Sequence, residues 1–195
     1  SRLMFPLGSL SKDEVRDIAR ELGLIPAEKP DSTGVCFVPG GDYRDYLAAQ
    51  GGLVPEEGEI VDGEGKVLGK HKGVFSFTIG QRRGLGIALG KPVYVTGIEP
   101  KRNRIVIGGQ EELYGRKLVA ENITWINDSY LNDIVEVNAK VRYRHRESSA
   151  EVHMSSETDA TVEFREPQRS ITPGQAVVFY RNDKVLGGGW IKEVV

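Results

Sequence analysis

The residue with the clearest chemical potential is Cys36, the only cysteine of the chain. It lies in the run DSTGVCF at residues 31–37, close to Lys29 and beside turn-forming residues. A thiolate is a strong nucleophile, and a nearby cation lowers the pKa of an exposed thiol. A cysteine between valine and phenylalanine is also typical of a small apolar core residue. From these residues alone, a packed thiol is favoured over a reactive one.

A second candidate is the glycine-rich run TIGQRRGLG at residues 78–86, which places Gln81, Arg82 and Arg83 at the tip of a turn. Backbone N–H groups and guanidinium groups in such a turn can contact phosphate oxygens. The run does not have the P-loop pattern, because Lys91 is followed by Pro92 rather than by serine or threonine. A solvated hairpin tip is the alternative interpretation.

A third candidate is the alternation of basic residues at positions 140–146. A strand there would place Lys140, Arg142, Arg144 and Arg146 on one face. Like charges at this spacing repel one another, and a polyanion would relieve the repulsion. We therefore favour RNA contact at this stripe over the alternative of a charged face that keeps a sheet soluble.

The composition limits the remaining possibilities. The net charge of -2 gives no general attraction to nucleic acid, so RNA contact must come from local patches. A lone cysteine excludes a disulfide within the chain and is typical of a reducing compartment, and no run approaches the roughly 20 apolar residues of a membrane span. We expect a cytoplasmic protein without membrane contact. The three histidines and the cysteine show no metal-ligand spacing, so no metal site is predicted.

The elements that must position these residues are mainly β. A helix is expected at residues 11–23, because Ser11 and Glu14 have capping-box spacing, apolar residues recur at the helical period, and Gly23 supplies a stop. Short β-branched runs separated by turn residues follow from about residue 53. They predict a first set of strands at 59–61, 74–79, 93–98 and 104–107, with turns at 62–63 and 100–103. A second set at 118–123, 134–144, 150–154, 160–164, 176–180 and 185–191 predicts a small closed barrel of six strands.

Taken in order, these motifs resemble the tRNA-specific 2-thiouridylases. The resemblance rests on FPLG at 5–8, DSTGVCF at 31–37, GKHKG at 69–73, TIGQRRGLG at 78–86, RYR at 142–144, ITPGQAVVFY at 171–180 and GGGWI at 187–191. It covers essentially the whole chain. It implies a mainly β fold with a short helical amino-terminal remnant, a small central β domain and a carboxy-terminal barrel like one in translation elongation factors. The implied domains are residues 1–52, with the helical end of an ATP domain and the cysteine loop, 53–114 and 115–195.

The resemblance also implies the chemistry. In that family ATP, with Mg²⁺ expected beside it, adenylates C2 of the wobble uridine, and a persulfide on the cysteine matched by Cys36 then supplies sulfur. The family's PP-loop ATP domain is expected to lie outside this chain, so we expect no cofactor bound to this part and no turnover by it alone. A second cysteine of the ATP domain is implied to form a disulfide with the first as sulfur is released. The implied partners are tRNA and a persulfide donor or relay protein, and a monomer is expected.

The same resemblance implies tRNA contact through Arg142, Tyr143 and Gln175 on the barrel, beside Gln81, Arg82 and Arg83 in the glycine-rich loop. The alternative is a non-catalytic RNA-binding module on a translation-factor-like barrel, in which Cys36 only packs. Labelling of the native thiol separates the two hypotheses, because a buried structural cysteine resists reagents until the protein unfolds.

Overall fold

The structure is a computed structural model of the 195-residue chain, and it describes residues 4–24, 56–127, 134–143 and 145–195. The chain divides into two compact units, Ser1–Leu53 and Val54–Val195, which are described separately. Cys36 and its neighbours at 25–55 lie outside the described residues, as does Arg144.

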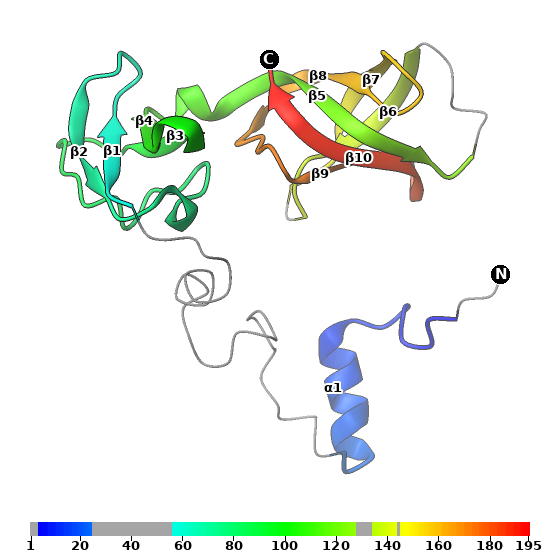
Figure 1. The fold of residues 1–195 in the computed structure, drawn as a ribbon. Helices are drawn as coiled ribbons and strands as arrows, with labels where there is room; N and C mark the ends of the chain where they lie inside the picture. Colours follow the sequence, from blue (N-terminus) through cyan, green and yellow to red (C-terminus); the bar gives the residue numbers. More distant parts are fainter. Residues whose placement is uncertain (1–3, 25–55, 128–133, 144) are drawn as a thin grey trace. The chain divides into compact units, whose positions relative to one another are not determined.

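The first unit contains helix α1, Lys12–Glu21, which confirms the predicted helix (Figure 1). Ser11 is its N-cap, and the capping box is complete. The Glu14 N–H donates to Ser11 Oγ at 3.4 Å, and the Ser11 N–H donates to Glu14 Oε2 at 2.7 Å. These hydrogen bonds from Ser11 lower the pKa of Glu14. Gly23 takes a φ of 65°, the left-handed conformation that commonly ends a helix.

The second unit begins with a four-stranded sheet in the order β2-β1-β4-β3 (Figure 1). Its strands are β1 (Gly58–Val61), β2 (Val67–His71), β3 (Tyr94–Glu99) and β4 (Arg104–Gly108). Strand β1 runs parallel to β4, and the other pairs are antiparallel. Both predicted turns are present, at 62–66 between β1 and β2 and at 100–103 between β3 and β4. The sheet packs on a small core that includes Ile60, Val95 and Ile105.

One prediction for this sheet is wrong, and one strand of it was not predicted. The expected strand at 74–79 is a turn of 3-10 helix, Val74–Ser76, followed by irregular chain. Its apolar side chains still pack against the core, so the hydrophobic run reports burial and not strand pairing. Strand β2 was not predicted, because Gly69, Lys70 and His71 lack the β-branched signature.

His71 anchors β2 and is buried. Its Nδ1 accepts the Gly73 N–H at 3.0 Å, and Nε2 lies 3.2 Å from the Asn103 carbonyl oxygen. The ring is therefore neutral with its proton on Nε2, and burial lowers its pKa. This role accounts for the GKHKG motif without any metal.

The rest of the second unit is a closed barrel with strand order β10-β5-β8-β7-β6-β9, which confirms the predicted six-stranded barrel (Figure 1). Every pair in it is antiparallel. Alternate residues face a continuous core that contains Phe164 and Phe179. The strands are β5 (Tyr114–Trp125), β6 (Ile134–Lys140), β7 (Ser148–Met154), β8 (Ala160–Arg169), β9 (Ala176–Arg181) and β10 (Lys184–Val194).

Strand β10 passes very close to its neighbours at its glycine run. A Cβ at Gly188 would lie 2.6 Å from the Val177 carbonyl oxygen, well inside van der Waals contact. Side chains are excluded at this point of the barrel wall, which gives a structural reason for the GGGW motif.

The strand predicted across residues 140–146 is wrong in its extent. Strand β6 ends at Lys140, and the His145 N–H donates to the Arg142 carbonyl oxygen at 3.1 Å, which closes a turn instead of extending the strand. Val141, which is 1% exposed, still continues the alternation of buried residues along β6, so Lys140 and Arg142 line one groove together as predicted. Arg144, the next member of the predicted stripe, lies outside the described residues.

Candidate functional site

The glycine-rich run at 78–86 forms a tight loop on the central sheet, called here the arginine loop. Gly80, Gly84 and Gly86 all have positive φ values, which a non-glycine residue would rarely adopt. The loop is fastened to β3, because the Gly80 N–H donates to the Val95 carbonyl oxygen at 2.8 Å and the Val95 N–H donates to the Gln81 carbonyl oxygen at 2.9 Å.

The side chain of Gln81 works inside this loop. Its Oε1 accepts the Thr78 N–H at 3.1 Å, and its Nε2 donates to the Arg83 carbonyl oxygen at 2.9 Å. The amide thus bridges both ends of the turn and leaves Arg82 and Arg83 exposed. The loop presents two arginines to solvent and has no lysine followed by serine or threonine, so we assign no ATP site to it.

On the barrel, the structure brings together three predicted site residues that are far apart in sequence. Arg142, Tyr143 and Gln175 line one groove of about 720 Å³, called here the barrel groove. Sequence reasoning linked them only through the family resemblance, and it missed the other lining residues. Among the described residues, the lining consists of Lys140, Val141, Arg142, Tyr143, His145, Gln175, Ala176, Val178 and Tyr180.

The barrel groove is electropositive. Lys140, Arg142 and His145 line it, and none of the described residues that line it is acidic. Burial lowers the pKa of His145, and the charges of Arg142 and Arg169 lower it further. The charges of Arg142 and Arg169 therefore reach His145 and disfavour its protonated form, and an anion in the groove would offset that positive potential.

Tyr143 gives the groove an aromatic platform. Its side chain is 93% exposed, an unusual position for a large ring. Aromatic rings beside cations are the usual means of holding unstacked nucleobases next to a phosphate backbone. This geometry suits single-stranded or looped RNA better than a small-molecule substrate.

Arg142 and Gln175 differ from Tyr143 because both are partly buried. Arg142 Nη2 donates to the Ile79 carbonyl oxygen at 3.1 Å and to Thr172 Oγ1 at 2.7 Å. Its Nε and the Oε1 of Gln175 are buried without a partner among the described residues. Burial lowers the pKa of Arg142, as does the charge of Arg169.

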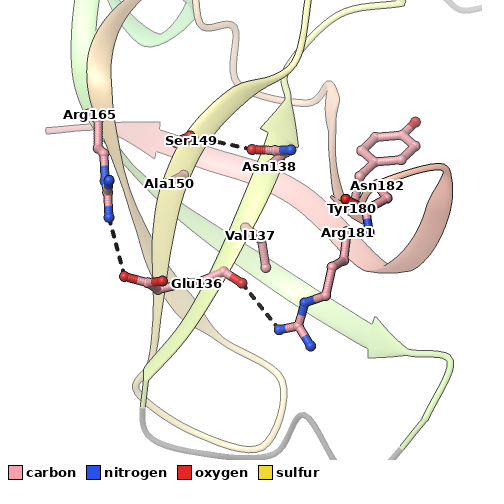
Figure 2. A pocket seen from close by; sticks show the side chains of 9 residues that line it. All are labelled: Glu136, Val137, Asn138, Ser149, Ala150, Arg165, Tyr180, Arg181 and Asn182. Carbon is pink, nitrogen blue, oxygen red and sulfur yellow. Dashed lines mark hydrogen bonds and ion pairs between the residues drawn. The ribbon is translucent and has the colours of Figure 1, made fainter.

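A second hollow, of about 230 Å³, lies over β6, β7, β8 and β9 (Figure 2). Its polar groups satisfy one another. Arg165 lies 3.2 Å from the Glu136 carboxylate, Arg181 donates to the Glu136 carbonyl oxygen at 3.4 Å, and Ser149 donates to Asn138 Oδ1 at 3.4 Å. We therefore prefer the barrel groove, whose described lining residues include cations but no carboxylate, as the candidate site.

Other kinds of site find no support in the part of the chain that is described. No group of three or more potential metal ligands occurs within residues 4–24, 56–127, 134–143 and 145–195. In the same ranges no helix is both long and apolar enough to cross a membrane.

Comparison with family models places the chain among tRNA-modifying proteins. Residues 1–40 match a tRNA methyl transferase HUP domain, residues 45–109 a tRNA methyl transferase PRC-barrel domain, and residues 115–191 an aminomethyltransferase beta-barrel domain. The closed barrel and the four-stranded sheet occupy the last two of these segments.

Comparison with curated relatives identifies one family among these tRNA-modifying proteins. The chain is 48% identical over 193 residues to the tRNA-specific 2-thiouridylase MnmA of Acidithiobacillus ferrooxidans, covering 98% of this chain and 55% of that protein. It is 47% identical over 191 residues to the MnmA of Geobacter metallireducens, covering 98% of this chain and 52% of that protein. The chain belongs to the tRNA-specific 2-thiouridylase family, and it spans about half the length of the curated relatives it matches.

Proposed function

We propose that this chain is the tRNA-holding and sulfur-carrying part of a cytoplasmic tRNA 2-thiouridylase. The observation that carries the proposal is the barrel groove, where an exposed aromatic ring stands beside cations and no acidic side chain occurs among the described lining residues. The names of the relatives support tRNA as the nucleic acid.

Two surfaces would hold the tRNA. In the barrel groove, Tyr143 stacks on an unpaired base, while Lys140 and Gln175 face the backbone and base edges and Arg142 adds positive charge at the base of the groove. On the arginine loop, Arg82 and Arg83 contact phosphates, and Gln81 keeps the loop in shape. The net charge of -2 makes these local surfaces the only strong attraction we expect between the chain and RNA.

The sulfur chemistry would use Cys36, whose support is its motif and the family, because it lies outside the described residues. ATP, bound by another part of the full-length protein, supplies the activation that turns the C2 oxygen of uridine into a leaving group. The outer sulfur of a Cys36 persulfide attacks C2, and AMP departs with the oxygen. A second thiol, from the remainder of the protein, then attacks the Cys36 sulfur. The S–S bond breaks, the thiocarbonyl stays on the tRNA, and a disulfide forms.

Binding of an unmodified tRNA transcript by the 195-residue chain tests the holding role. Fluorescence anisotropy at about 50 mM salt should show saturable binding that weakens steeply as salt rises. Binding that is absent, or that does not change with salt, would contradict the role. The alternative of a non-catalytic RNA-binding module also predicts binding, and it is separated from the enzyme by the product. Nucleoside mass spectrometry of tRNA treated with the full-length protein distinguishes 2-thiouridine from unmodified or methylated uridine.

A further inference from the structure

Three short segments of the second unit meet at one junction. They are the base of the arginine loop, the bend after β6 that carries Arg142, and the turn Ser170–Thr172 after β8. The turn is well fixed. Ser170 is buried, its N–H donates to the Leu113 carbonyl oxygen at 2.7 Å, and its own carbonyl oxygen accepts the Thr172 hydroxyl at 2.9 Å.

The guanidinium of Arg142 ties these segments together. Because its Nη2 donates both to Thr172 Oγ1 and to the Ile79 carbonyl oxygen, it links the barrel to the residue that directly precedes Gly80 and Gln81. A hydrogen bond from a charged donor is roughly twice as strong as a neutral one. The contact is therefore suited to holding the arginine loop in place.

Close packing at Gly80 supports the same conclusion. A Cβ on Gly80 would lie 2.6 Å from Ser170 Oγ, and the φ of Gly80 is 87°. The backbone of the loop thus lies directly against the Ser170 turn. Arg169, the last residue of β8, directly precedes Ser170. Its guanidinium lies 5.7 Å from the centre of the Tyr94 ring on β3, which adds a cation–π contact between the barrel and the sheet.

Direct contact with RNA explains Arg142 less well. Its Nη2 is engaged twice and its Nε is buried, whereas Tyr143, the next residue, is 93% exposed. A residue that serves chiefly to contact a polyanion would present its guanidinium to solvent, as Arg82 and Arg83 do.

We propose that Arg142 is a positioning residue that latches the arginine loop to the barrel through Thr172 and Ile79, so that Arg82, Arg83 and the barrel groove present one surface to RNA. The RNA part of this inference rests on the proposed function. The latch itself does not, because it is a contact within the protein.

The sharpest variant is Thr172→Val, which keeps the shape of the side chain and every positive charge but removes one of the two acceptors of Arg142. It also removes the hydrogen bond from the Thr172 hydroxyl to the Ser170 carbonyl oxygen, so it is measured beside an Arg142 variant that leaves that bond intact. Apparent affinity scales with the fraction of molecules in the competent arrangement, so a loop that is aligned a tenth of the time weakens tRNA binding roughly tenfold. Arg142→Lys keeps the charge but not the planar fork, and it should weaken binding to a similar extent. Thr161→Val, the same change within β8, is the matched control and should leave binding unchanged.

Two readouts separate the latch from the RNA role. Without RNA, hydrogen exchange at the Gly80 amide should be roughly tenfold faster in Thr172→Val, while amides of β8 keep their protection. With RNA, Arg82→Ala should cost less affinity in the Thr172→Val background than in the wild type, because the loop is already misaligned.

An unchanged Gly80 exchange rate overturns the latch, whether or not tRNA binds. Faster exchange with unchanged tRNA affinity, or losses for Arg82→Ala and Thr172→Val that simply add, overturns the positioning role. If the wild type fails to bind tRNA, the proposed function falls and the exchange result still decides the latch.

Discussion

The exposed arginines of the arginine loop allow a quantitative prediction. Arg82 and Arg83 lie at the tip of a loop that Gln81 and three glycines hold in shape, so their removal should leave the fold intact. Each phosphate contact that is lost lowers the slope of log affinity against log salt by about 0.7 to 0.9. The double variant Arg82→Ala/Arg83→Ala should therefore lose about 1.5 from the slope.

The difference in tRNA affinity between the wild type and the double variant should therefore shrink as the salt concentration rises. Between about 50 and 200 mM salt, a slope difference of about 1.5 changes the ratio of the two dissociation constants by roughly eightfold. The wild type should bind tRNA much more tightly at low salt, and the two proteins should converge at high salt. Fluorescence anisotropy titrations at four or five salt concentrations give both slopes.

The matched control is Lys66→Ala/Lys101→Ala, which removes two exposed cations from the two turns of the same sheet. Its slope should equal that of the wild type. An equal loss in both double variants would show that only net charge matters, and an unchanged slope in the Arg82/Arg83 variant would refute phosphate contact by the loop.

Three further predictions concern single residues. Tyr143→Ala should weaken tRNA binding by about 2 kcal/mol while Tyr143→Phe retains most of the affinity, because stacking needs the ring and not the hydroxyl; equal losses in titrations of the two variants would exclude stacking. His71 is neutral in the fold and its pKa is lowered by burial, so it contributes stability above its unfolded pKa of about 6.5 that is lost as pH falls below that value. Urea unfolding between about pH 7 and pH 5 should show this loss of stability. NMR titration of the folded protein should show the His71 ring still neutral below about pH 6.5, and a ring that titrates normally would contradict the assignment. Gly188→Ala should lower the free energy of unfolding by about 2 to 3 kcal/mol, because its Cβ would meet a carbonyl oxygen, whereas Gly63→Ala meets nothing closer than 3.8 Å and should be nearly neutral in the same urea assay; equal stabilities would refute the close approach.

Much of the fold follows from local sequence signals. The capping box at Ser11 and Glu14 lies within one turn, so it is readable from spacing alone. The barrel strands were predicted from runs rich in β-branched and aromatic residues between turn residues, which suit the half-buried wall of a barrel, as the burial pattern in the first half of β8 illustrates. The two errors in the central sheet arose because local residue types do not report which segments pair as strands. The run at 74–79 is apolar because it packs under the sheet, and β2 carries glycine and charges because its pairing with β1 does not depend on β-branched side chains.

The candidate site was less accessible to sequence reasoning. Alternating charge predicted a basic stripe on a strand, but β6 ends at Lys140 and the chain turns between Arg142 and His145. The contacts of Arg142 join it to residues 30 and 63 positions away, a separation that no local pattern reports. The one available signal was the ITPGQ motif, which contains both Thr172 and Gln175 and was recognised from the family without any contact being assigned to Thr172.

The central claim is that Cys36 carries the sulfur that this family places on tRNA. The direct test uses a full-length protein made by joining this chain to the amino-terminal part of the Acidithiobacillus ferrooxidans relative, with Cys36→Ser as the variant. Single-turnover reactions with ATP, a persulfide donor and an unmodified tRNA transcript are analysed for 2-thiouridine by mass spectrometry, with tRNA binding measured in parallel. We predict that Cys36→Ser abolishes thiolation while tRNA affinity is unchanged. Thiolation at the wild-type rate would contradict the claim and would leave this chain as the tRNA-holding part of the enzyme alone.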